Sequence, residues 1–156
     1  MIQRKQSVFL LLAAIVLGLL YYFPLASFIG DKDSLEFYVY LVASKVPDQV
    51  PDLPVYFVLP VLTLNTLIML LTIVSIFLFR KRMLQLNLVR INLILLLVMI
   101  AGFFFYYVPA LEDLSGGIVE YEMGAYFPLV AFIFYIMAYR GILFDEKLVR
   151  SADRLR

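Results

Sequence analysis

The sequence predicts an all-α membrane protein built as a bundle of four transmembrane helices. Of its 156 residues, 64% are hydrophobic, whereas a soluble domain is nearer half apolar. The mean hydropathy is +0.96, and the apolar residues gather in four long runs with almost no charge. A bilayer core of roughly 30 Å needs about 20 apolar residues in a helix, so each run is a candidate span.

The predicted spans cover approximately residues 8–29, 55–79, 91–111 and 124–140. The first is uncharged from Gln6 to Gly30 and is either a span or a signal peptide, since Arg4 and Lys5 precede it. Its length favours a span, because a signal peptide has a hydrophobic region of only about 7–15 residues. The fourth can continue past Arg140, whose long side chain can reach the headgroups. Residues 1–156 are then a single integral membrane domain.

The charges of the connecting segments predict the orientation. One side carries eleven Lys and Arg against three carboxylates, a net charge of +8, and the other carries two Lys against nine carboxylates, a net charge of −7. The basic side consists of both termini and the segment between the second and third spans. Because basic loops stay in the cytoplasm, both termini are expected there.

Two segments on the acidic side are expected to form a small extracytoplasmic cap. Glu36 to Val42 is rich in aromatic and β-branched residues and is either a strand or a short interfacial helix opened by Asp33 and Glu36. Ile118 to Glu122 alternates apolar and polar residues, which is typical of a strand. The favoured arrangement pairs these two segments. The segment from Val46 to Pro54 contains three prolines and excludes regular structure, because proline lacks an N–H and restricts the residue before it.

Similar motifs stand at the outer ends of the first and third spans, in Tyr21 to Ala26 (YYFPLA) and Tyr106 to Leu111 (YYVPAL). Two explanations remain open. The halves of the chain are either duplicated hairpins, as in some transporters, or similar by convergence. Convergence is a simple explanation, because apolar helices use few residue types and Tyr and Pro both favour helix ends.

The composition excludes much enzyme chemistry. There is no Cys, hence no thiolate nucleophile, and no His, the commonest metal ligand and near-neutral acid or base. The carboxylates of the acidic side lack a metal-ligand spacing, and no ionisable residue lies in the interior of a predicted span. The sequence therefore predicts no catalytic residue, no metal ligand and no cofactor, and the chain is not expected to be an enzyme or to bind nucleic acid.

Two asparagines stand inside the second and third spans. Asn65 is fifteen residues from Arg80, or about 22 Å of helix, whereas Asn92 is two residues from Arg90. They are therefore at different depths, and Thr72 or Ser75 is the expected neighbour of Asn92. Polar groups of this kind usually stabilise helix packing, although a role in transport stays open.

The connection from Arg80 to Arg90 is basic and should lie near anionic headgroups, each charge contributing about 1 kcal/mol close to the surface. The candidate ligands of a lipid headgroup are Arg80, Lys81, Arg82 and Arg90. The alternative is that these residues only set the topology.

Residues 141–156 are expected to form a cytoplasmic amphipathic helix. Phe144, Leu148, Ala152 and Leu155 recur at helical spacing. The polar face carries both signs of charge, whereas a helix that lies on a membrane has a mainly basic face. This mixture favours a protein partner. The candidate partner-binding residues are Arg4, Asp145, Glu146, Leu148, Arg150, Asp153, Arg154 and Arg156.

The two ends of the chain, MIQRKQSVFLLLAA and GAYFPLVAFIFYIMAYRGILFDEKLVRSADRLR, resemble a family of short bacterial membrane proteins classed as the domain of unknown function DUF4293. Lys5 stands where an apolar residue is expected in that family. The resemblance implies four spans in the inner membrane of a Gram-negative bacterium. It implies no activity, substrate or catalytic residue.

The leading hypothesis is a non-enzymatic inner-membrane accessory or scaffold subunit that docks a larger protein through its C-terminal helix. The alternative is a small transporter or channel made of two repeated hairpins, with a polar cavity near Asn65 and Thr66. A membrane enzyme that uses Ser, Thr, Tyr or loop carboxylates is the third hypothesis. The oligomeric state is left open.

Overall fold

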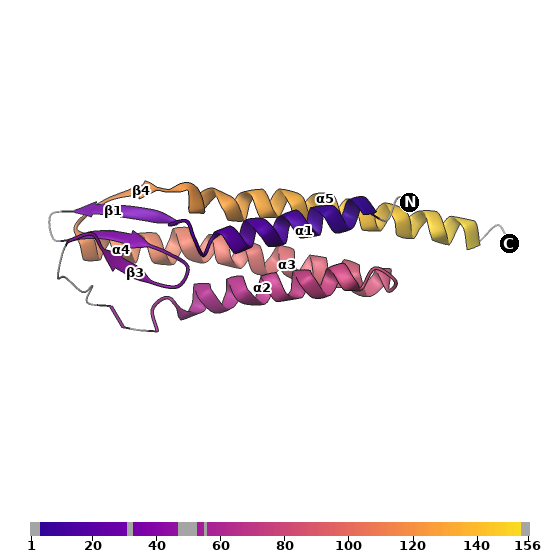
Figure 1. Cartoon of the computed structure of the whole chain (residues 1–156), viewed down its shortest axis with the longest axis horizontal. Coiled ribbons are helices and arrows are strands. Elements are labelled where there is room, and N and C mark those ends of the chain that lie inside the picture. Colours follow the sequence, from indigo (N-terminus) through magenta and orange to yellow (C-terminus); the bar gives the residue numbers. More distant parts are fainter. Residues whose placement is uncertain (1–3, 31–32, 47–52, 55, 154–156) are drawn as a thin grey trace.

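The computed structural model describes residues 4–30, 33–46, 53–54 and 56–153, without the side chains of residues 4, 5, 149, 150, 152 and 153. The fold is mostly helical, with a small sheet at one end (Figure 1). The helices are α1 (Arg4–Leu19), α2 (Leu59–Phe77), α3 (Arg82–Gly102), the π-helix η1 (Phe103–Tyr107), α4 (Val108–Ser115) and α5 (Met123–Asp153). The strands are β1 (Ala26–Gly30), β2 (Ser34–Phe37), β3 (Val42–Ser44) and β4 (Gly117–Tyr121).

The long helices form a four-membered ring in which neighbours run in opposite directions (Figure 1). Helix α1 packs against α2 and α5, and α3 packs against the same two helices. We call the end that carries the strands the sheet end and the opposite end the helical end. The described chain begins at the helical end, and α5 also finishes there (Figure 1).

The outward surface of the bundle marks the chain as a membrane protein. Three helical segments of the described residues are long and apolar enough to cross a membrane: Leu59–Phe77, Arg82–Ser115 and Met123–Leu148. Their exposed apolar residues include Leu67, Leu70, Ile73, Ile91, Ile94, Leu97, Ile133 and Ile136. The buried polar residues between the helices include Asn65, Thr72, Ser75, Gln85 and Asn92. A water-soluble bundle places charged and polar residues outside, so this distribution suits surrounding lipid.

The prediction of a span over residues 8–29 is wrong in its second half. Helix α1 ends at Leu19 and has 16 residues, and residues 26–30 form strand β1. Pro24 explains the break, because a proline disfavours helical conformation in the residue before it. Strand β1 was not predicted because it follows the apolar residues of α1 without a change of composition, and periodicity does not distinguish a buried strand from a buried helix.

The predicted second span, 55–79, contains α2 but exceeds it at both ends. Tyr56 to Val58 form a turn before Pro60, which stands in the first turn of the helix, and Leu78 and Phe79 belong to the next turn. The predicted connection from Arg80 to Arg90 is wrong, since α3 already begins at Arg82. Leu, Met, Gln and Arg, which make up most of residues 82–90, all favour helix. The basic residues of this segment are therefore compatible with a helical start of α3.

The third and fourth spans are longer than predicted. The helical run continues from Arg82 to Ser115, and the π-helix ends at Tyr107, two residues before Pro109. A proline inside an α-helix removes one hydrogen bond and clashes with the preceding turn, and a π-helical turn is a local adjustment of this register. Residues 124–140 and the described part of the predicted tail, up to Asp153, belong to one continuous 31-residue helix, α5.

The cap is a four-stranded antiparallel sheet in the order β3-β2-β1-β4. Strand β4 confirms the predicted strand at 118–122 to within one residue. Residues 36–42 belong to the two strands β2 and β3 and the turn between them, which excludes the interfacial helix. The predicted pairing is wrong, because β2 and β4 do not pair with each other: each pairs with β1. Residues 47–52 of the proline-rich segment lie outside the described residues.

The inner face of the sheet continues the core of the bundle. Phe28, Leu35 and Phe37 are fully buried, and the Phe37 ring stacks on Phe103 and Tyr107 of η1 with centroid distances of 6.1 and 5.1 Å. Aromatic pairs at this spacing add to the stability that burial gives. The sheet is thereby fixed to the α3–η1–α4 segment.

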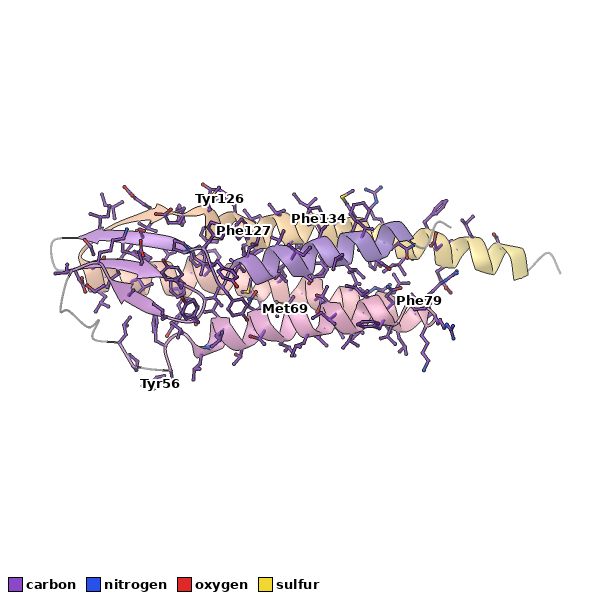
Figure 2. The ribbon with its side chains drawn as sticks, viewed as in Figure 1. Tyr56, Met69, Phe79, Tyr126, Phe127 and Phe134 are labelled. Atoms are coloured by element: carbon purple, nitrogen blue, oxygen red, sulfur yellow. The ribbon has the colours of Figure 1, made fainter. Side chains whose placement is uncertain are left out.

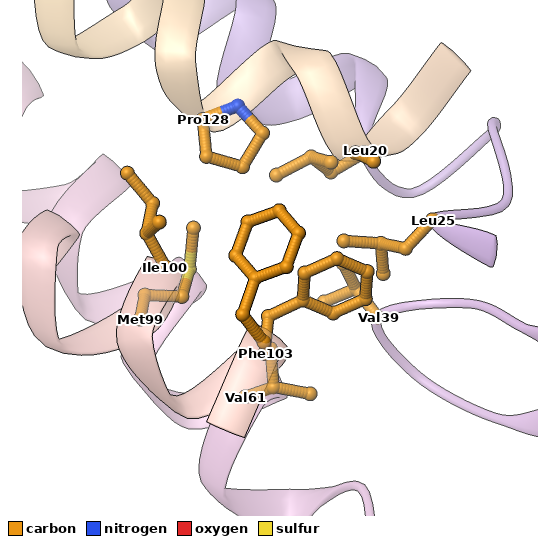
Figure 3. Close-up of a pocket in the computed structure, with 10 residues that line it drawn as sticks. Leu20, Leu25, Val39, Val61, Met99, Ile100, Phe103 and Pro128 are labelled. Carbon is orange, nitrogen blue, oxygen red and sulfur yellow. The ribbon is translucent and has the colours of Figure 1, made fainter. Parts of the chain in front are cut away.

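A small cavity lies where the sheet meets the helices (Figure 3). Its volume is about 10 Å³, and its lining is apolar, with Phe103, Leu20, Leu25, Ile100 and Pro128 around it. A water molecule needs roughly 10–15 Å³ and two or more polar partners. This cavity is therefore a packing gap and not a ligand site.

The two similar motifs adopt different structures. Tyr21 to Ala26 forms a turn that leads into β1, whereas Tyr106 to Leu111 is helical throughout, in η1 and α4. The equivalence of these outer ends, on which the hypothesis of duplicated hairpins depended, is therefore absent from the fold.

Candidate docking surface at the helical end

Polar side chains connect the helices in the interior of the bundle. Thr72 donates its proton to the carbonyl oxygen of Ile68 at 2.6 Å. Because its hydroxyl has one proton, Thr72 accepts from Tyr135 OH and from Asn92 Nδ2, the latter at 3.1 Å. The predicted neighbour of Asn92 is thus confirmed, and one threonine joins α2, α3 and α5.

Three further hydrogen bonds join α2 to neighbouring segments. Gln85 Nε2 donates to the carbonyl oxygen of Ser75 at 3.0 Å, and Asn65 Nδ2 donates to that of Leu17 at 3.4 Å. Thr66 Oγ1 shares a 2.7 Å bond with Tyr21 OH. Asn65 and Thr66, near which the alternative hypothesis placed a polar cavity, therefore bind α1 and the turn that follows it.

At the helical end, three distant parts of the chain meet at Asp145. Gln6 of α1 donates to the Asp145 carboxylate through Nε2, and Arg82 of α3 donates to the Asp145 carbonyl oxygen at 3.3 Å. Gln6 and Asp145 are only 8% and 7% exposed. Gly141 lies one turn deeper, where a side chain would press against Gln6. Asp145 is therefore a structural anchor of α5, not an open contact residue.

An open hollow of about 520 Å³ lies beside this anchor, between the α2–α3 turn and α5. We call it the basic hollow. It is lined by Arg80, Lys81, Arg82, Met83, Leu84 and Glu146. Helix α3 starts here without an acidic residue in its first turn, so its positive end adds to the basic side chains.

The last turns of α5 project beyond the other helices at this end (Figure 1). Phe144, next to the anchor at Asp145, and Leu148, on the projecting part, are 59% and 47% exposed, and they are four residues apart, hence on one side of the helix. We call this side the tail surface. Lys147 and Ser151 are exposed beside the tail surface.

The structure brings together some of the predicted site residues and separates others. Arg80, Lys81 and Arg82 share the basic hollow with Glu146, but Arg90 is about two turns deeper, where it donates to Tyr139 OH at 3.2 Å and stacks on that ring. The remaining predicted contacts lie outside the described side chains: Arg4, Arg150, Asp153, Arg154 and Arg156.

Sequence reasoning missed Gln6, Gln85 and Tyr135. A tyrosine in the middle of a span was a usable signal, because this residue normally stands at the membrane interface. Nothing local distinguishes Gln6 or Gln85, whose partners are on other helices.

The sheet end is acidic. Lys45 forms an ion pair with Glu36 at 2.9 Å, and Tyr38 OH donates to the same carboxylate at 3.1 Å. Burial raises the pKa of Tyr38, and Glu36 raises it further. Tyr56 and Tyr126 point outward near this end, and Phe79 lies near the other (Figure 2). Within the described ranges, no three His, Cys, Asp or Glu side chains could hold a metal ion.

Comparison with known proteins places the chain in a family. A search of curated proteins finds no match. The family described as Domain of unknown function (DUF4293) matches residues 2–155, which is nearly the full length. The chain therefore belongs to the DUF4293 family.

Proposed function

We propose that this protein is a non-enzymatic scaffold or accessory subunit of a bacterial inner membrane, which docks a larger protein through the tail surface. It would cross the membrane four times, with α1 as a span in addition to the three longer helical segments, and both termini would lie in the cytoplasm. The observation that carries the proposal is the projection of α5 beyond the bundle, with Leu148 exposed on the projecting part and Phe144 exposed one turn before it.

The distribution of charge supports this orientation. The described basic side chains of the helical end are Arg80, Lys81, Arg82, Arg90, Arg140 and Lys147. The described carboxylates of the sheet end are Asp33, Glu36, Glu112, Asp113, Glu120 and Glu122. Basic segments remain on the cytoplasmic side. Helix α1 measures about 24 Å, so it can cross together with the apolar residues of the following turn.

The orientation can be tested by labelling, since the chain has no cysteine of its own. In cells whose outer membrane has been opened, a membrane-impermeant maleimide should label Ile118→Cys, on exposed β4, without lysis. Ser7→Cys in α1 and Ser151→Cys in α5 should be labelled only after lysis. Labelling of Ser7→Cys without lysis would show that α1 does not cross, and the reverse pattern at all three positions would invert the orientation.

The length and direction of α5 favour a protein partner over the bilayer surface. Its 31 residues span about 46 Å, against roughly 30 Å for the bilayer core. The helix is continuous through Asp145 and follows the bundle axis (Figure 1). To lie flat on the membrane it would have to break at this point, where Gln6 and Arg82 hold it.

The interior offers little for catalysis or transport. Asn65, Gln85 and Asn92 each donate a hydrogen bond to another helix, which is the usual role of such groups in membranes. Among the described side chains, Asn65 Oδ1, Ser75 Oγ and Asn92 Oδ1 are buried without a hydrogen-bond partner, and they lie on different turns of α2 and α3 and form no single site. This leaves the surface at the helical end as the part of the molecule best suited to a function.

A truncation that removes residues 147–156 tests the docking proposal. It spares Asp145 and Glu146, so the contacts of the bundle with Gln6 and Arg82 remain. In membranes treated with a crosslinker, we expect the full chain to retain a larger protein on purification and the truncated chain to retain at least tenfold less. Quantitative mass spectrometry measures the difference.

Two single substitutions provide the comparison. Leu148→Glu should reduce the retained protein as the truncation does, because it places a charge in an apolar contact. Lys147→Gln, which changes an exposed residue beside the tail surface, should leave it unchanged. Equal recovery of the same protein with all variants would refute docking by the tail surface.

A further inference from the structure

The basic hollow combines charge and apolar surface in a way that the docking proposal does not use. Three of its six lining residues are consecutive cations, Arg80, Lys81 and Arg82, and one is a carboxylate, Glu146. The hydrogen bond of Arg82 goes to a backbone carbonyl, so this contact does not neutralise its charge. The lining has a net charge of +2, which favours an anionic ligand.

The surroundings of the hollow are apolar and exposed. Met83 and Leu84, which line it, are both 49% exposed, and Phe77 and Phe79 at the end of α2 are also exposed. The Arg80 guanidinium lies 5.8 Å from the centroid of the Phe79 ring. A ligand that fits this surface has an anionic group joined to apolar chains, because a free phosphate would leave the apolar part unused.

We propose that the basic hollow binds an anionic glycerophospholipid, with Arg80 and Lys81 at its phosphodiester and the acyl chains beside Met83 and Leu84. Guanidinium and ammonium groups are the usual protein ligands of phosphate. A basic pocket between membrane helices on the cytoplasmic side is a suitable place for such a headgroup. The inference rests on the proposed position of the helical end at the membrane surface, but it is independent of any protein partner.

The test uses the purified full chain and lipids with identical acyl chains. Native mass spectrometry measures how much phosphatidylglycerol and phosphatidylcholine remain bound at equal concentration. We expect at least a tenfold preference for phosphatidylglycerol in the unchanged protein. Arg80→Gln/Lys81→Gln should reduce the preference to less than threefold, and Arg82 is retained because it also contacts Asp145.

The matched control is Arg140→Gln/Lys147→Gln, which removes two exposed cations from α5 outside the hollow. It should keep the tenfold preference. An equal loss in both double variants would mean that net charge alone attracts the lipid, and an unchanged preference in the first would place the lipid elsewhere. Either result overturns the proposal.

Glycerol phosphate, which has no acyl chain, separates the two sources of the anionic group. At millimolar concentration it should not displace bound phosphatidylglycerol. Complete displacement would show that the hollow recognises phosphate alone, and the lipid proposal would then be rejected. These results do not depend on the labelling or truncation experiments, so either proposal can fail without the other.

Discussion

Gly117→Ala is expected to lower the free energy of unfolding by about 3 kcal/mol, the upper part of the usual range for overpacking. Gly117 opposes Gly30 in the β1–β4 pair. A Cβ atom at Gly117 would lie 1.9 Å from the Ile29 carbonyl oxygen and 2.3 Å from Gly30 Cα. Both are backbone atoms, so β4 would have to move away from β1. Equilibrium unfolding of the purified protein in lipid bicelles measures the loss.

Gly18→Ala and Gly102→Ala are matched controls, since a Cβ atom at either position meets nothing within 4 Å. Alanine favours helix over glycine by about 0.5–1 kcal/mol, so both variants should be neutral or slightly stabilised. If Gly117→Ala were as stable as these controls, the close register of β1 and β4 would be incorrect.

Tyr135→Ala should destabilise the bundle by about 4 kcal/mol, as expected for deletion of a large buried aromatic side chain. Tyr135 is fully buried and heads the largest side chains of the core. Its removal leaves a cavity between α5 and α2 and also removes the hydroxyl group that contacts Thr72. The same unfolding measurement applies.

Tyr135→Phe separates the two contributions. It keeps the ring and removes only the hydroxyl group, while Thr72 retains its bonds to Ile68 and Asn92. The expected cost is about 1 kcal/mol, in the range found for hydrogen bonds between membrane helices. Equal costs for the two variants would mean that packing around Tyr135 contributes little, contrary to its burial.

The helical bundle could be predicted because its signal is carried by composition. Long uncharged runs and basic or acidic connections are visible without any knowledge of contacts. The depth of Asn92 also follows from counting residues from Arg90, and this sufficed to predict Thr72 or Ser75 as its neighbour, of which the structure shows Thr72. Both inferences need only the composition of one helix or the rise per residue along it, and no knowledge of which helices touch.

The missing strand and the helical end required tertiary information. Pro24 and Pro109 follow similar residues, but after Pro24 the chain finds two strand partners, whereas after Pro109 it continues with the helix-favouring residues of α4. Gln6, Arg82 and Asp145 meet from three separate helices. No local sequence pattern predicts this contact, because each of the three is an ordinary polar residue near a helix end.

Docking by the tail surface can be observed most directly with a photoreactive residue at position 148, activated in native membranes. Leu148 is exposed on the projecting part of α5. The control carries the same residue at Leu97, which is exposed on the outward side of α3. Mass spectrometry identifies the adducts at each position.

If the tail surface docks a partner, position 148 should form an adduct with one larger protein, and position 97 should form adducts with lipid alone. Lipid adducts alone at both positions, or no adduct at position 148, would contradict the docking function.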